Sequence, residues 1–76
     1  MERINNNETP AERFKRVAEA RTNAVIDKIR ILGNLSNRQM YSYSEEDINK
    51  IFSAINKQVR EVRAKFNSQK EKRFKL

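Results

Sequence analysis

Apolar residues recur at alternating intervals of four and three residues through the second half of the chain. We call this set the C-terminal seam; it comprises Ile48, Phe52, Ile55, Val59, Val62 and Phe66, with Ile51 beside them. At ~100° per residue, all seven lie within an arc about 100° wide. This a/d spacing predicts a helix with one narrow apolar face, suited to lengthwise packing against another helix.

The first half of the chain carries two apolar stripes. The first stripe is Phe14, Ala18, Thr22, Val25, Ile29 and Leu32, and the second stripe is Val17, Ala24 and Ile31. The two stripes lie about 100° apart on one helix, so a single neighbouring helix cannot cover both. We expect the first stripe to pack within the chain and the second against another subunit. The alternative is that the small side chains of the second stripe need no partner.

Capping signals set the start and end of the first predicted helix. Thr9 can cap the helix, Pro10 suits its first turn, and Glu12 can reach back to the amide of the cap, which is a capping box. Gly33 follows the last apolar residue. We expect it to end the helix in the left-handed conformation that glycine adopts readily.

The second predicted helix starts at Ser44. Three carboxylates follow the cap at Glu45, Glu46 and Asp47, where they face the positive end of the helix dipole. Tyr43 and Ile48 have the spacing of a hydrophobic staple across this cap. No strong stop signal appears before Asn67 and Ser68.

These signals predict an all-α fold. We expect helices at about 10–32 and 45–68 that form an antiparallel hairpin over residues 9–68, preceded by a disordered segment 1–8 and followed by a basic tail 69–76. Because a chain of 76 residues has room for only a small core, we expect two hairpins to dimerise into a four-helix bundle. A single continuous helix per chain is disfavoured by Gly33 and the second cap.

The connector between the helices, Gly33 to Tyr43, is longer than most connections in helical bundles. Ser36 to Arg38 can start one short helical turn. Leu35, Met40, Tyr41 and Tyr43 can plug the open end of the hairpin, which is the interpretation we favour. The combination of Arg38, Met40 and the tyrosines is also typical of binding hot spots, so a recognition loop is the alternative.

Composition argues against catalysis. The chain has no cysteine and no histidine, which removes thiol nucleophiles, imidazole bases and the usual zinc ligands. We expect no catalytic residue, metal, cofactor or small-molecule substrate. The chain has neither an apolar signal segment nor a stretch that could span a membrane, so we expect a cytoplasmic protein without a membrane role.

Positive charge is concentrated at the C-terminal end. Eight of the seventeen basic residues lie within Lys57 to Leu76 beside two acids, which gives this segment +6 of the net +7. Such a segment attracts polyanions through phosphate contacts that do not read base sequence. We therefore predict DNA binding through Lys57, Arg60, Arg63, Lys65, Lys70, Lys72, Arg73 and Lys75. Solvation of an ordinary helix face is the alternative for the residues before Lys70.

A protein partner is the second functional hypothesis. The residues that would carry it are those of the second stripe together with part of the connector, namely Val17, Arg21, Ala24, Ile31, Arg38, Met40 and Tyr41. Arg21 lies between the two stripes, where its stem can pack and its head can pair with a carboxylate. A third hypothesis is a purely structural subunit. A helix-turn-helix reader is not supported, because no short recognition helix is present.

Three blocks carry a resemblance to a known group of proteins. They are residues 12–23, from Glu12 to Asn23; residues 31–34, Ile-Leu-Gly-Asn; and residues 43–52, from Tyr43 to Phe52. Together they resemble short uncharacterised proteins encoded on plasmids and integrated mobile elements of low-GC Gram-positive bacteria, over roughly residues 11–66. The resemblance implies a genomic setting and no activity or site residue. Transfer and replication accessories, transcriptional regulators and inhibitors of host defence are common functions there.

Overall fold

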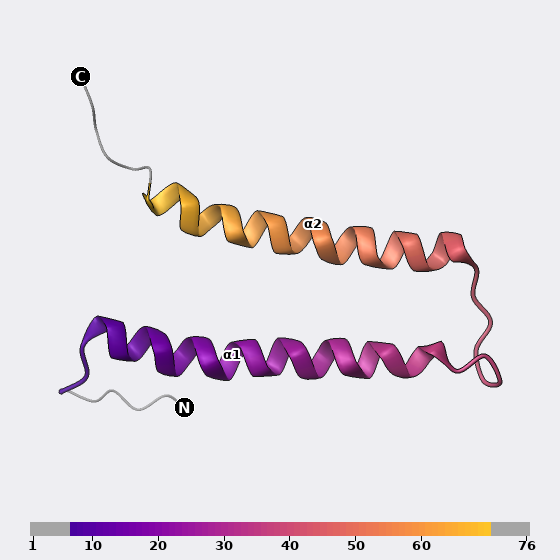
Figure 1. Ribbon diagram of the computed structural model, residues 1–76, viewed down its shortest axis with the longest axis horizontal. Coiled ribbons are helices and arrows are strands. Elements are labelled where there is room, and N and C mark those ends of the chain that lie inside the picture. The colour runs from indigo at the N-terminus through magenta and orange to yellow at the C-terminus, as the bar shows by residue number, and fades with distance from the viewer. Residues whose placement is uncertain (1–6, 71–76) are drawn as a thin grey trace, which may run out of the picture. The chain divides into compact units, whose positions relative to one another are not determined.

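The structure is a computed structural model that describes residues 7–70, with backbone only at Lys70. Its elements in order are α1 (Pro10–Gly33), a short 3-10 helix η1 (Asn34–Ser36) and α2 (Glu45–Lys70) (Figure 1). No strand occurs within residues 7–70, so the predicted all-α class with two helices is confirmed. The chain divides into two units, residues 1–41 and 42–76, which we describe separately.

The start of α1 has the predicted capping box. The Thr9 hydroxyl accepts a hydrogen bond from the Glu12 amide at 3.1 Å, and the Glu12 carboxylate accepts one from the Thr9 amide at 2.9 Å. Thr9 is extended at φ −73° and ψ 161°, and Pro10 occupies the first helical position. These reciprocal bonds satisfy two of the backbone amides that an N-terminus leaves without a partner.

The end of α1 corrects the prediction for Gly33. Gly33 has φ −62° and ψ −21°, in the right-handed helical region, so the expected left-handed cap is wrong. The chain instead tightens directly into η1, and the Asn34 amide donates to the Ile31 carbonyl. A 3-10 turn of this kind satisfies terminal carbonyls without a residue of positive φ. Gly33 therefore lies in a backbone conformation that residues with a side chain also adopt readily.

The connector contains a second turn, which Asn37 organises. Its side-chain oxygen accepts from the Gln39 amide at 2.9 Å, and its carbonyl accepts from the amides of Met40 and Tyr41 at 3.1 and 3.0 Å. An asparagine that bonds the backbone two residues ahead is a common way of starting a turn. One short turn therefore starts at Asn37, within the predicted Ser36 to Arg38, and η1 lies directly before it.

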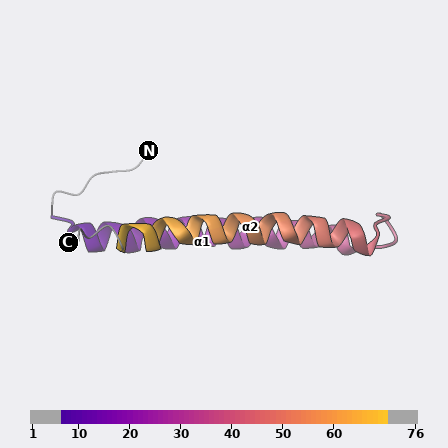
Figure 2. The ribbon, with the colours of Figure 1, turned by 90° about the horizontal axis from the view of Figure 1, so that it is seen from above.

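The start of α2 is fixed by a second reciprocal cap. The Ser44 hydroxyl accepts from the Asp47 amide at 3.0 Å, and the Asp47 carboxylate accepts from the Ser44 amide at 2.9 Å. From there α2 runs unbroken to Lys70, past the expected stop at Asn67 and Ser68 (Figure 2). These two residues lower helix propensity by only about 0.5 kcal/mol each, which neighbouring helix formers offset.

Neither helix encloses a core of its own. None of the residues whose side chains the structure describes is buried, and Phe14, Phe52 and Phe66 are 59%, 46% and 59% exposed. The least exposed aliphatic residues lie on the stripes and the seam, and they are Val17, Ala18, Leu32, Ile48, Ile51 and Ile55. Because most of the stability of a helix in a protein comes from packing of its amphipathic face, we expect both helices to depend on packing partners.

Candidate functional site

The densest cluster of charged contacts lies where the chain enters α1. The Glu8 carboxylate accepts hydrogen bonds from Nε and a terminal nitrogen of Arg16, at 2.9 and 3.1 Å. The Arg13 Nε lies 3.8 Å from the nearer Glu8 oxygen. The Glu8 side chain is 11% exposed, whereas those of Arg13 and Arg16 are 52% and 43% exposed. Glu8 thus lies beneath two arginines that face solvent.

The charge of Glu8 is stabilised by this arrangement. The hydrogen bond from Arg16, together with the positive charges of Arg16 and Arg13, lowers the pKa of Glu8 below its usual value of 4.5. Desolvation acts in the opposite direction and is outweighed. Glu8 belongs to the segment predicted to be disordered; residues 1–6 of that segment lie outside the described residues, and Glu8 itself is held against α1.

The predicted DNA-binding residues fall into two groups. Lys57, Arg60, Arg63 and Lys65 are exposed on α2, and at ~100° per residue they surround the helix on several sides. Within residues 7–70 none of these four forms an ion pair, and neither does Glu61. Lys70 ends α2, and its side chain is not described; Lys72, Arg73 and Lys75 lie outside the described residues.

The predicted partner-binding residues of α1 are all accessible. Ile31 is 57% exposed, Ala24 and Arg21 are exposed, and Val17 is half-buried. Arg21 forms no ion pair with any acid that the structure describes, so the expected carboxylate partner is not found within this part of the chain. The second stripe is therefore an uncovered apolar strip beside an uncompensated cation.

The predicted recognition residues of the connector also face solvent. Met40 is 73% exposed and Tyr41 is 43% exposed, and both follow the Asn37 turn. Arg38 is exposed within the same turn. The turn therefore presents sulfur and aromatic surface on a backbone that its own hydrogen bonds hold in place.

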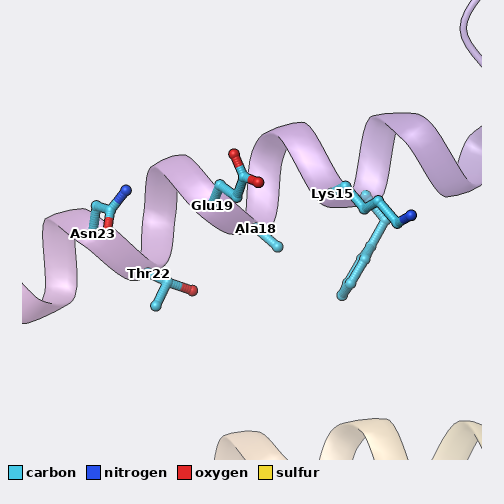
Figure 3. A pocket seen from close by; sticks show the side chains of 6 residues that line it. Lys15, Ala18, Glu19, Thr22 and Asn23 are labelled. Carbon is cyan, nitrogen blue, oxygen red and sulfur yellow. The ribbon is translucent and has the colours of Figure 1, made fainter.

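A shallow hollow lies on the flank of the first stripe that is remote from the second stripe. Phe14, Lys15, Ala18, Glu19, Thr22 and Asn23 line it (Figure 3). Ala18 and Thr22 leave α1 on one side, and Glu19 and Asn23 leave it on the other (Figure 3). The small side chains of Ala18 and Thr22 leave the space that forms the hollow.

The described residues hold neither a metal-type cluster nor a membrane span. Residues 7–70 contain no group of three or more acids, histidines or cysteines placed to hold a metal ion. Neither α1 nor α2 has an apolar stretch of the length that a bilayer crossing requires. No protein-family model matches the chain, and no curated protein or solved structure shows significant similarity to it.

Sequence reasoning did not find the Glu8 cluster. Arg16 lies eight residues after Glu8, a spacing that belongs to neither a helix nor a strand, so no periodic pattern connects the two. The contact forms across the extended backbone of Thr9, with the Glu8 side chain beside Arg13 and Arg16 in the first two turns of α1. An acid immediately before a helix cap, followed by arginines in the first two turns, is the sequence signal that could have found it.

Proposed function

We propose that this protein is a small, noncatalytic DNA-binding factor that serves as an accessory or regulator in a mobile genetic element. The observation that carries the proposal is the uncompensated positive charge of the C-terminal half of α2. Four exposed cations there have no acidic partner among the described residues, and the segment from Lys57 onward carries +6. Unpaired surface cations are what phosphate backbones bind, with release of counterions.

The hairpin is the first structural part of the proposal. The first stripe and the C-terminal seam have matching lengths, and one antiparallel register aligns most of their residues. In that register the facing pairs are Leu32 with Ile48, Val25 with Ile55, Ala18 with Val62, and Phe14 with Phe66. Each pair would bury side chains that are exposed or half-exposed on the separate helices, at roughly 25 cal/mol per Å² of apolar surface.

Cysteine pairs test this register cleanly, because the chain has no cysteine of its own. A disulfide requires Cα atoms no more than about 7 Å apart. We expect Ala18→Cys with Val62→Cys to form an intrachain disulfide readily, as measured by intact mass and non-reducing electrophoresis. Ala18→Cys with Ala64→Cys is the matched control, since Ala64 lies on the opposite face of α2 from the seam. Equal cross-linking in both variants would reject the register.

The dimer is the second structural part. After the first stripe is covered, the second stripe still presents Ile31, which is 57% exposed in the structure, on the uncovered side of α1. A second copy that packs there completes a four-helix bundle. Two copies also double the number of cations that meet one duplex, which raises the affinity without new chemistry.

The expected mode of DNA binding follows from the elements available. No short recognition helix occurs in the described residues, so the contacts expected are to phosphates and not to base edges. Binding should therefore be indifferent to sequence and steeply dependent on salt, with a slope of about −0.9 per phosphate contact. These properties fit an accessory or architectural role in the cytoplasm.

Fluorescence anisotropy with a labelled mixed-sequence duplex, at low and near-physiological salt, tests the function. Sedimentation in the same buffers gives the mass of the binding species. We expect binding by a dimer that weakens steeply with salt. Replacement of Lys70, Lys72, Arg73 and Lys75 by glutamine in the full-length chain should weaken it further and leave helicity unchanged. Absence of binding at low salt would refute the proposal.

A second candidate function is a protein-interaction module, an adaptor or inhibitor. The exposed Ile31, Met40 and Tyr41 favour it, because aromatic and sulfur-bearing side chains are enriched at the centres of interfaces. Affinity purification before and after nuclease treatment separates the two candidates. One partner retained at fixed stoichiometry after nuclease treatment, and lost on Met40→Ser with Tyr41→Ser, would favour the protein partner over DNA.

A further inference from the structure

The Glu8 cluster consists of two arginines around a carboxylate. Two arginines around a phosphate would make a phosphate-binding site. Arg16 presents Nε and one terminal nitrogen to the two Glu8 oxygens at 2.9 and 3.1 Å. This side-on fork is the geometry in which arginine binds carboxylates and phosphates alike. Arg13 contributes a second guanidinium, three residues earlier and on the same side of α1.

The fit of the carboxylate to the two arginines is incomplete. Both Glu8 oxygens are engaged by Arg16, and the Arg13 Nε lies 3.8 Å away, beyond hydrogen-bond distance. A DNA backbone phosphate also has two non-bridging oxygens, and because it is not tethered to the residue before the helix cap, it can lie between the two guanidinium groups and accept from both. A DNA phosphodiester carries one negative charge, as Glu8 does, so it can replace Glu8 beside these two arginines without changing the charge balance of the cluster.

Exchange of the two anions is energetically feasible. Arg13 and Arg16 are about half exposed, with 52% and 43% of their side-chain surface accessible. Glu8 itself is 11% exposed, but because both arginines face solvent the pair is worth about fivefold in an equilibrium constant. Glu8 also precedes the helix cap, so it can leave the cluster without disturbing the capping box between Thr9 and Glu12.

We propose that Arg13 and Arg16 form a binding site for a DNA backbone phosphate, and that Glu8 occupies this site in the free protein. DNA binding then displaces Glu8, which acts as a competitor within the same chain. The inference rests on the proposed DNA-binding function and adds to it a site on α1. In the antiparallel hairpin proposed above, this site lies at the level of Arg63 and Lys65, so one duplex can meet both.

The test compares Glu8→Gln with Glu19→Gln. Both variants raise the net charge by one, but Glu19 is an exposed acid of α1 that pairs with no described residue. Anisotropy with the mixed-sequence duplex should show tighter binding for Glu8→Gln, by about three- to fivefold per site, because the competitor is removed. Glu19→Gln should show a smaller gain. Equal gains in the two variants would overturn the inference.

A double-mutant cycle separates direct competition from general charge repulsion. Arg16→Gln should weaken duplex binding and reduce the salt slope by about 0.9 per lost phosphate contact. The loss should be larger in the Glu8→Gln background, because Arg16 in the unaltered chain must first release Glu8. Losses that are equal in both backgrounds would reject displacement. Circular dichroism of all four proteins checks that helicity is retained.

Two further outcomes have definite meanings. If none of the proteins binds the duplex at low salt, the proposed function fails, and that failure is distinct from equal gains or equal losses among proteins that do bind. Pyrophosphate, titrated against the protein–duplex complex, distinguishes the source of the phosphate. Displacement of the duplex by pyrophosphate at an ionic strength where chloride does not displace it would show that the site prefers a free phosphate. That result would overturn the assignment of the site to a DNA backbone.

Discussion

The two helices start alike and differ in what they need from neighbours. Both α1 and α2 begin with a reciprocal cap in which a hydroxyl and a carboxylate exchange bonds with each other's amides. The apolar residues of α2 lie in one arc about 100° wide, whereas the two stripes of α1 together cover about 180° at ~100° per residue. One neighbour can cover the apolar face of α2, whereas covering both stripes of α1 would take two. The cap therefore fixes where each helix starts, and the width of its apolar arc indicates how many neighbouring helices can pack against it.

The largest effect is expected from a charged residue placed in the C-terminal seam. Ile55→Asp should abolish cooperative folding, or lower the free energy of unfolding by about 3 kcal/mol or more, because the single neighbour of α2 would bury an unpaired carboxylate. Urea unfolding followed by circular dichroism at fixed protein concentration measures the loss. Ser53→Asp is the control on the polar face of α2 and should stay within about 0.5 kcal/mol of the unaltered chain.

A charge in the second stripe should break association instead. Ile31→Asp should weaken the dimer about a hundredfold or more, because two symmetry-related copies each lose roughly 1.5 kcal/mol or more of apolar burial. Analytical ultracentrifugation over a concentration series gives the dissociation constant. Ile26→Asp is the matched control, since Ile26 is also exposed, at 42%, but belongs to neither stripe. Equal weakening by both variants would contradict a dimer built on the second stripe.

Removal of either cap should produce a smaller loss. Ser44→Ala and Thr9→Ala should each lower the free energy of unfolding by about 1 kcal/mol, since each leaves helix amides without an acceptor. We expect Ser44→Ala to have the larger effect, because the chain before α1 is also held by Glu8 and its arginine partners. Thermal and urea melts at one protein concentration compare the two. A larger loss for Thr9→Ala would show that the Glu8 contacts depend on the cap.

The glycine at the end of α1 gives a prediction of opposite sign. Gly33→Ala should raise the free energy of unfolding by about 0.4–1 kcal/mol, because alanine restricts the unfolded chain and accepts the native backbone angles. A Cβ atom added at Gly33 meets nothing within 4 Å. Destabilisation in the same melts would indicate a left-handed Gly33 in solution, since alanine there costs about 1 kcal/mol or more.

The smallest expected effect is a dependence of stability on pH that comes from Glu8, just before α1. The pKa of Glu8 is lowered in the folded chain below 4.5, so its contribution to stability is complete above that value. The contribution is lost as the pH falls through the lower, folded pKa, when Glu8 becomes protonated. Subtracting the melting curves of Glu8→Gln from those of the unaltered chain between pH 6 and about pH 2 isolates this loss. A flat difference would mean that the ion pairs add no stability.

Local signals of the chain predicted most of the secondary structure. Thr9 with Glu12, and Ser44 with the acids after it, fixed both helix starts, because a cap depends only on residues within one turn of each other. Helix ends were predicted less well. Gly33 has two sterically accessible conformations, and its residue type alone does not select between them. The hydrogen bond from Asn34 to Ile31 makes the selection in the structure.

Some of the candidate sites could also be predicted from the sequence, and one could not. The cations of α2 and the second stripe could be read from composition and periodicity, and the structure finds them accessible. The Glu8 cluster could not, because its members are joined across the turn before α1 by a spacing without periodicity.

The sequence by itself determined the helical class, the two helix starts and the three apolar surfaces, since these depend on hydrogen bonds and side-chain repeats within a few residues. The three-dimensional structure alone decided the right-handed Gly33, the Asn37 turn and the contact of Glu8 with Arg16. Each of these depends on the path that the backbone takes between elements. Several backbone torsions are sterically allowed at these positions. The chain adopts the combination in which the most backbone polar groups form hydrogen bonds.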